Sequence, residues 1–297
     1  MKNTINKLAI IGLGLMGGSL GMAVREKGIV RTVSGFARRK EVREEAIKRG
    51  AVDLVYDNIE EAVKDADMVI LCVPVLAVPE LAQSSLPYLA PGCVVTDVAS
   101  TKTTIIASIE RLFQNEKIYF VGSHPMAGSE QTGIQFARKD LYKNAVVAVT
   151  PTRRSRASAV KTVVNFWKKL EASPILLSPQ EHDAIVARTS HLPHLIAACI
   201  VTSVFKEKNR KTALLCGPGF RDFTRIASSS EELWHDIIST NSSAILKEMR
   251  NFIVVIDRVT RMIENKDFAQ VRDFLRRSRL LRNEWISSTG KNEHSKR

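Results

Sequence analysis

The sequence predicts an α/β protein in which an N-terminal Rossmann-type parallel sheet, with helices on both faces, precedes an all-α C-terminal domain. Three observations predict this fold class. A glycine-rich turn follows the first apolar run, short apolar runs alternate with helix-length segments over the first half, and β-rich runs stop near residue 176. Continuous apolar runs such as MVILCV suit strands that are covered on both faces, which indicates a parallel sheet between two helical layers.

The first domain is predicted to span residues 1–175. Its expected strands are Leu8–Ile11, Thr32–Phe36, Met68–Val73, Val94–Val98, Ile118–Gly122 and Ala145–Val149. Its expected crossover helices are Gly17–Lys27, Lys40–Arg49, Val75–Leu89 and Thr103–Phe113, followed by a helix with a basic face over Ser155–Leu170. A short strand-like PILL segment ends this half of the chain.

The helical domain is predicted to span residues 176–286, with residues 287–297 as a flexible tail. Ser178 and Glu181 enclose Pro179 in a capping-box pattern, so a helix should begin here and run past Pro193 with a kink. Apolar residues then recur at spacings of 4, 3, 4, 3 and 4: Ile245, Met249, Phe252, Ile256, Val259 and Ile263. Such a seam fits either an internal bundle helix or a helix that forms a dimer.

The composition limits the classes of partner. Lys and Arg number 44 against 31 Asp and Glu, so the net charge of +13 favours an anionic partner: nucleic acid, a membrane surface or a small acidic molecule. Aromatic residues make up only 6%, which leaves few stacking surfaces for single-stranded nucleic acid. The four cysteines show neither CxxC pairing nor metal-ligand spacing, so a reduced, cytoplasmic compartment is expected.

The N-terminal apolar stretch is not interpreted as a secretory signal. Glycines at 12, 14, 17, 18 and 21 interrupt it, and no small-x-small cleavage site follows. No other segment reaches the roughly 18–20 uncharged apolar residues that a membrane span requires. We therefore expect no membrane association.

A dinucleotide-binding loop follows the first expected strand. Gly12, Gly14 and Gly17 form G-x-G-x-x-G at the start of a helix: the first permits the turn, the second lets the backbone approach a pyrophosphate, and the third lets helix and strand pack closely. The expected cofactor-binding residues are Gly12, Gly14, Leu15, Met16, Gly17, Val73 and Pro74.

The end of the second expected strand favours NADP, with NAD possible. An NAD site has Asp or Glu about 20 residues beyond the glycine loop to bind the ribose hydroxyls. Here the strand leads into Ala37, Arg38 and Arg39, and a guanidinium suits a 2′-phosphate. Alternatively, Arg38 and Arg39 simply begin a solvated helix.

Polar residues stand where a Rossmann domain presents its site, at the carboxyl ends of strands. Ser100 lies in TDVASTK after one strand, and His124 lies in SHPMAGSEQTG after another, on an expected proline- and glycine-shaped loop. In the helical half, His191 and His194 of SHLPH share a helix face, but no acidic residue accompanies them, so no metal site is predicted. Farther on, Asp222 and Arg225 have the spacing of an ordinary helix ion pair.

Taken together, these motifs resemble a known family. GLGLMGGSL, DxxSxK, SHPMAGSE, SHLPH and GFRDFTRIA occur in this order in the prephenate and arogenate dehydrogenases of tyrosine biosynthesis, and the resemblance covers about residues 7 to 285. It implies an N-terminal Rossmann domain, a helical domain for substrate binding and dimerisation, and the oxidative decarboxylation of a cyclohexadienol. The chain departs from NAD-using members because Ala37 replaces their acidic residue.

The resemblance also implies roles for individual residues. His124 would accept the proton of the substrate hydroxyl, Ser100 would bond to that hydroxyl, and Arg225 would clamp a substrate carboxylate. The other substrate-binding candidates are His191 and His194 in the pocket, Ser129 and Glu130 beside the catalytic loop, and Asp222 and Trp234 near the site, partly across a dimer. The substrate would be a small dianion, prephenate or L-arogenate, which the sequence does not distinguish.

Two other functions are weaker. A β-hydroxyacid dehydrogenase or imine reductase shares GLGxMG, but uses a lysine on a glycine-containing helix that the second half lacks. A nucleotide-sensing regulator that binds nucleic acid would explain the charge, but the densest basic cluster, Arg272–Arg282, has no helix-turn-helix partner. We therefore expect that the protein does not bind nucleic acid, and the resemblance implies a homodimer.

Overall fold

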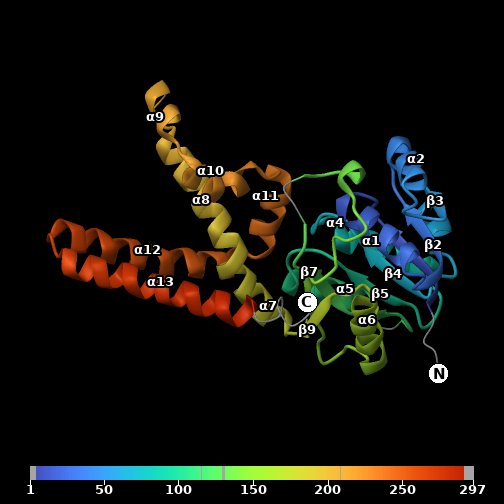
Figure 1. Ribbon diagram of the computed structural model, residues 1–297. Coiled ribbons are helices and arrows are strands. Elements are labelled where there is room, and N and C mark those ends of the chain that lie inside the picture. The colour runs from blue at the N-terminus through green and yellow to red at the C-terminus, as the bar shows by residue number, and fades with distance from the viewer. Residues whose placement is uncertain (1–4, 115, 129–130, 208, 291–297) are drawn as a thin grey trace. The chain divides into compact units, whose positions relative to one another are not determined.

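The computed structural model describes residues 5–114, 116–128, 131–207 and 209–290 (Figure 1). The chain divides into two compact units, Met1–Ile245 and Leu246–Arg297. The first unit contains all the described strands and the helices up to residue 240, and the second contains a pair of long helices.

The core of the first unit is a six-stranded sheet in which each described pair of neighbouring strands is parallel. Its order is β3-β2-β1-β4-β5-β6. The strands are β1 (Ile5–Ile11), β2 (Val30–Phe36), β3 (Leu54–Tyr56), β4 (Met68–Leu71), β5 (Val94–Asp97) and β6 (Tyr119–Phe120). This is the predicted Rossmann-type sheet.

Helices cover both faces of this sheet, as predicted. They are α1 (Leu15–Glu26), α2 (Lys40–Lys48), α3 (Ile59–Val63), α4 (Ala77–Ser85), α5 (Thr103–Leu112) and α6 (Ala157–Lys169). Alternate residues of β1 point to opposite faces: Leu8 and Ile10 join one buried cluster, Ala9 and Ile11 the other. The two clusters make β1 a fully covered central strand.

A second, three-stranded sheet corrects two expectations. Its order is β7-β8-β9, formed by β7 (Gly122–Pro125), β8 (Val146–Thr150) and β9 (Ser173–Leu176), with β7 antiparallel to β8. The segment around His124 is therefore a strand rather than a loop, and the strand expected at 145–149 does not join the parallel sheet. The four residues of β7, Gly-Ser-His-Pro, have low strand propensity. Hydrogen bonds from Ser123 to Asp97 hold the strand in place instead: its N–H donates to Oδ1 at 3.1 Å and its hydroxyl to the Asp97 carbonyl oxygen at 2.6 Å.

The helical half begins as predicted. Ser178 and Glu181 form the capping box of α7 (Pro179–Val186), which continues through a π-helical turn (Ala187–His191) into α8 (Leu192–Val204). The helix thus runs past Pro193, and the π turn lies just before that proline. The first unit ends with α9 (Arg210–Leu215), α10 (Pro218–Thr224), a 3-10 turn (Arg225–Ser228) and α11 (Glu231–Thr240).

The continuous α7–α8 helix also has the length and composition of a membrane span. It covers 26 residues, Pro179–Val204, with a mean hydropathy of 1.4 in its most apolar window. However, the Asp183 carboxylate accepts hydrogen bonds from the backbone N–H groups of Lys102 and Thr103, both at 2.8 Å. These bonds tie the α7 end of the helix to the start of α5, and 28% of its most apolar window is buried inside the protein.

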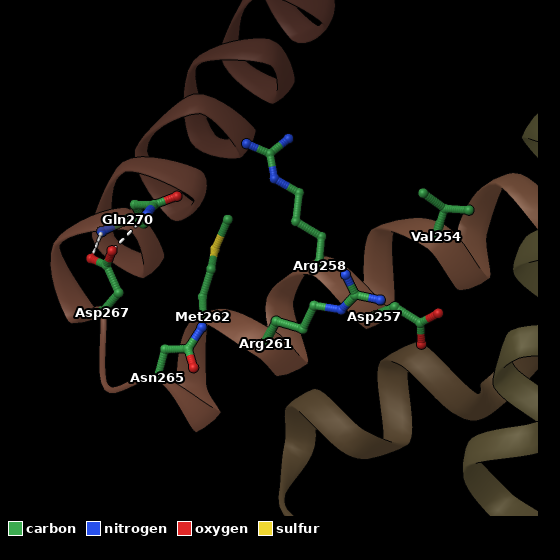
Figure 2. Close-up of a pocket in the computed structure, with 8 residues that line it drawn as sticks. All are labelled: Val254, Asp257, Arg258, Arg261, Met262, Asn265, Asp267 and Gln270. Carbon is green, nitrogen blue, oxygen red and sulfur yellow. Dashed lines mark hydrogen bonds between the residues drawn. The ribbon is translucent and has the colours of Figure 1, made fainter.

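The second unit is a helical hairpin. It comprises most of α12 (Ser242–Glu264) together with α13 (Phe268–Gly290), and Asp267 caps α13 by accepting a hydrogen bond from the Gln270 N–H at 3.1 Å. A polar cavity of about 400 Å³ lies at the hairpin tip (Figure 2). Two residues of the apolar seam, Ile256 and Ile263, are about half exposed. Helix α13 continues through residues 287–290, where a tail was expected to begin, and residues 291–297 lie outside the described part.

Candidate active site

The glycine-rich loop between β1 and α1 has the shape that a dinucleotide requires. Gly12 has φ of 96°, and a Cβ there would lie 2.4 Å from the carbonyl oxygen of Cys72. A Cβ on Gly17 would lie 1.9 Å from the carbonyl oxygen of Gly12, so close packing requires glycine at both positions. By contrast, nothing lies within 4 Å of a Cβ built on Gly14, the N-cap of α1. An open helix N-terminus suits a pyrophosphate, so the loop fits a dinucleotide.

A cavity of about 300 Å³ adjoins this loop. Most of the expected cofactor residues line it: Gly14, Leu15, Met16, Val73 and Pro74. Ser100 and His124 line it too, and Leu233 and Ile237 of α11 contribute from the helical half. The structure therefore brings the two expected catalytic residues and the expected cofactor loop together in one cavity.

Buried polar contacts shape the Ser100 segment. The Asp97 carboxylate accepts a hydrogen bond from the Ala99 N–H at 3.1 Å and forms an ion pair with the Lys102 ammonium. Both side chains of this ion pair are fully buried. Since a buried charge is costly without a partner, the Asp97–Lys102 pair fixes the turn that carries Ser100.

A chain of hydrogen bonds runs from His124 into α7. Nδ1 of His124 lies 2.9 Å from Nε2 of His182, and Nδ1 of His182 lies 2.8 Å from Oδ1 of Asp183. An ionised carboxylate can only accept, so the His182 Nδ1–H donates to Asp183 and its Nε2 accepts the Nδ1–H of His124. This assignment leaves Nε2 of His124 without a proton, as a hydrogen-bond acceptor.

The charge states of the chain follow from its surroundings. Burial opposes ionisation of Asp183, but hydrogen bonds from His182 and Thr103 outweigh it, so the pKa of this carboxyl is lowered overall. Burial lowers the pKa of His124 well below its usual value, and the positive charges of protonated His182 and of Lys102 would lower it further. At neutral pH His124 is therefore a neutral acceptor that is linked through His182 to an anionic Asp183.

His182 and Asp183 were missed in the sequence. They directly follow the capping box, and a histidine–aspartate pair at a helix start is unremarkable on its own. Their connection to His124 spans 58 residues of chain and depends on how α7 packs against β7.

His191, His194 and Trp234 form an aromatic cluster. None of the three is among the described residues that line the cavity. The rings of His194 and Trp234 stack with centroids 3.4 Å apart, and His191 meets Trp234 edge-on at 5.9 Å. Burial lowers the pKa of His191 to about 4 and also lowers that of His194. Within the described chain, Nδ1 of His194 is buried without a hydrogen-bond partner.

The remaining candidates lie elsewhere. Asp222 and Arg225 are exposed, on α10 and at the start of the 3-10 turn, and do not line the cavity. Arg38 and Arg39 are exposed in the turn after β2. Ser129 and Glu130 lie outside the described residues.

A parallel sheet with an open glycine-rich loop, and a histidine acceptor beside it, define a dehydrogenase that uses a pyridine nucleotide. Two family models then match the chain: the nucleotide-binding domain of prephenate dehydrogenase over residues 20–176, and its dimerization domain over residues 178–277. The chain belongs to the prephenate dehydrogenase family.

Comparisons with individual proteins support this family assignment. The chain is 34% identical over 263 residues to a cyclohexadienyl dehydrogenase of Zymomonas mobilis, covering 88% of this chain and 89% of that protein. Prephenate dehydrogenase from A. aeolicus, solved with hydroxyphenyl propionate and NAD+, is similar with a TM-score of 0.90 and 27% identity, over 96% of this chain and 99% of that one. Synechocystis arogenate dehydrogenase has a TM-score of 0.81 and 28% identity, over 94% and 100% of the two chains. Family membership argues against the two other functions considered.

Proposed function

We propose that this protein catalyses the NAD(P)-dependent oxidative decarboxylation of prephenate or L-arogenate, with His124 accepting the proton of the ring hydroxyl. The observation that carries this proposal is that His124, whose Nδ1 lies 2.9 Å from Nε2 of His182, lines the cavity beside the glycine-rich loop. In this reaction a hydride leaves C4 of the ring, CO₂ leaves C1, and aromatisation drives both steps. A bound nicotinamide supplies the hydride acceptor.

The chain's own residues supply orientation and a place for the proton. Ser100 shares the cavity with His124 and is proposed to bond to the same hydroxyl. As His124 takes the proton at Nε2, its Nδ1–H remains donated to His182, and His182 remains donated to Asp183. Because hydrogen bonds from Lys102 and Thr103 favour the anionic form of Asp183, the carboxylate stays ionised and stabilises the positive charge on the imidazole pair.

A substrate with two carboxylates also requires cations. The described lining of the cavity contains neither lysine nor arginine. We assign the carboxylate clamp to Arg225, with His191, His194, Asp222 and Trp234 as further substrate residues, and Ser129 and Glu130 as neighbours of the catalytic loop.

For the cofactor we propose a preference for NADP over NAD. The support is the pair Arg38 and Arg39 after β2, and the absence of an acidic side chain at the buried Ala37. A guanidinium binds a phosphate in a bidentate manner, whereas it offers a ribose hydroxyl no acceptor.

The domain organisation and assembly are also proposals. We assign the nucleotide-binding domain to residues 1–175 and the helical domain to residues 176–286. We propose a cytoplasmic homodimer formed through the helical domain. The half-exposed Ile256 and Ile263 support this assembly, because a second copy would cover them.

The test is His124→Asn, with the exposed histidine variant His235→Asn as its control. Initial rates with prephenate and L-arogenate, each with NAD+ and NADP+, identify the substrate and cofactor of the wild-type protein. In His124→Asn the kcat should fall at least ~10²-fold with little change in KM, because general base catalysis contributes about 10²–10⁴-fold. A near-normal kcat would remove His124 from the mechanism.

A further inference from the structure

An arginine with no part in the mechanism above holds the turn after β2. One terminal nitrogen of Arg43, on α2, donates to the carbonyl oxygens of Ala37 at 3.0 Å and Arg38 at 2.8 Å. The other terminal nitrogen lies 3.1 Å from a carboxylate oxygen of Asp57. The Arg43 side chain is 18% exposed and that of Asp57 is 69% exposed. The guanidinium is thus partly buried against the turn, and a solvent-exposed carboxylate anchors it.

These bonds set the direction of two peptide groups. In a trans peptide the C=O and N–H bonds point in opposite directions. The carbonyls of Ala37 and Arg38 face Arg43, so the N–H groups of Arg38 and Arg39 face away from it. In the described part of the chain neither N–H donates a hydrogen bond. Helix α2 begins one residue later, and its N-cap, Arg39, makes no side-chain cap bond.

We propose that Arg43 is a specificity-determining positioning residue: by holding these two carbonyls, it keeps the backbone of Arg38 and Arg39 open to the 2′-phosphate of NADP. The proposal rests on the proposed NADP preference. Outward-facing carbonyl oxygens would repel a phosphate, whereas backbone N–H groups beside two guanidiniums attract it. The ribose hydroxyl of NAD can both donate and accept, so NAD binding depends little on the direction of these peptides.

Isothermal titration calorimetry of the full-length protein with NADP+ and with NAD+ tests this role without turnover. The variants are Arg43→Met and Asp57→Ala, and the control is Lys48→Met, which removes an exposed cation from the same helix. For Arg43→Met we expect the Kd for NADP+ to rise about tenfold. This is the effect of losing one charge-assisted hydrogen bond between a backbone N–H and the 2′-phosphate. The Kd for NAD+ should stay within about twofold. Asp57→Ala should weaken NADP+ binding in the same direction, and Lys48→Met should change neither constant.

The outcomes separate the two proposals. A wild-type protein that binds NAD+ more tightly than NADP+ would refute the cofactor preference and, with it, the role of Arg43. A wild-type protein that prefers NADP+, with both variants unchanged in the ratio of the two constants, would refute the role of Arg43 alone. An equal loss of both cofactors would also overturn it, because that result indicates general damage to the domain. If Arg43→Met does not fold, Asp57→Ala decides the question, since Asp57 is exposed.

Discussion

Replacing His182 with Phe removes the group that orients His124 while leaving its own imidazole in place. His182 is almost fully buried and does not line the cavity, so the substrate should bind with little change in KM. Phe has a ring of similar size but cannot accept the Nδ1–H of His124, which now donates over 2.9 Å. Asp183 keeps its bonds to the N–H groups of Lys102 and Thr103, so the start of α5 should remain capped.

The size of the effect follows from the bond that is lost. When His124 carries the transferred proton, its bond to His182 is charge-assisted, and such bonds contribute about 1.5–3 kcal/mol. At about 1.4 kcal/mol for each factor of ten, kcat should fall roughly 10- to 100-fold. His182→Gln retains an acceptor and should recover part of this loss.

Stopped-flow or steady-state absorbance of the reduced nicotinamide measures both variants. Melting temperatures within a few degrees of wild type would show that the comparison is between folded proteins. An unchanged kcat in a folded His182→Phe protein would refute the positioning role. The same would follow if Phe and Gln were equally impaired, because the acceptor is the feature that distinguishes them.

Four other predictions address the substrate clamp, the interface, and the pH dependence of activity and of stability. Arg225→Lys should raise the substrate KM by more than about tenfold and leave the cofactor KM unchanged, because lysine cannot bind a carboxylate in a bidentate manner; a lower melting temperature with an unchanged KM would mark Arg225 as structural. Phe252→Glu combined with Ile256→Glu should give monomers or unfolded protein by light scattering, and a stable dimer would place the interface elsewhere. The kcat/KM should stay level below the ordinary histidine pKa, because the lowered pKa of His124 keeps it neutral there; an acid limb at the ordinary value would contradict this. The pKa of His191 is about 4 in the folded protein against 6.5 when unfolded, so part of the free energy of unfolding is present above the unfolded pKa and is lost as the pH falls towards 4. The loss should be about 3 kcal/mol in all. Urea unfolding should show a smaller loss in His191→Gln.

Local signals in the sequence were sufficient for much of the fold. The glycine-rich loop, the apolar runs of β1, β4 and β5, and the Ser178 capping box each depend on neighbouring residues, and the structure confirms all of them. β3 was missed because it has only three residues. β7 is a strand where the sequence predicts a loop, because its Gly-Ser-His-Pro sequence is stabilised by distant partners rather than by strand propensity.

Some residues of the candidate site could likewise be predicted from local sequence, and others could not. Ser100 and His124 could be found because they follow expected strands, and both line the cavity. The bond from His124 to His182 could not be found, because it depends on the packing of α7 against β7. The positioning role of Arg43 could not be predicted either, because its place in the sequence is that of an ordinary charged residue on an amphipathic helix.

Asp183 accepts the last hydrogen bond in the series that starts at His124, and it also caps the start of α5. Through these two contacts the two halves of the protein depend on each other. The parallel sheet and the glycine-rich loop belong to the first 175 residues, and so does His124. The groups that set its tautomer arrive only with α7. A fragment that ends before α7 would therefore keep the glycine-rich loop that suits a nucleotide. In such a fragment, His124 would be free to exchange between its two tautomers. The residues of the nucleotide site and the groups that set the tautomer of His124 thus come from different stretches of the chain, and the tautomer is set only when the helical half has docked.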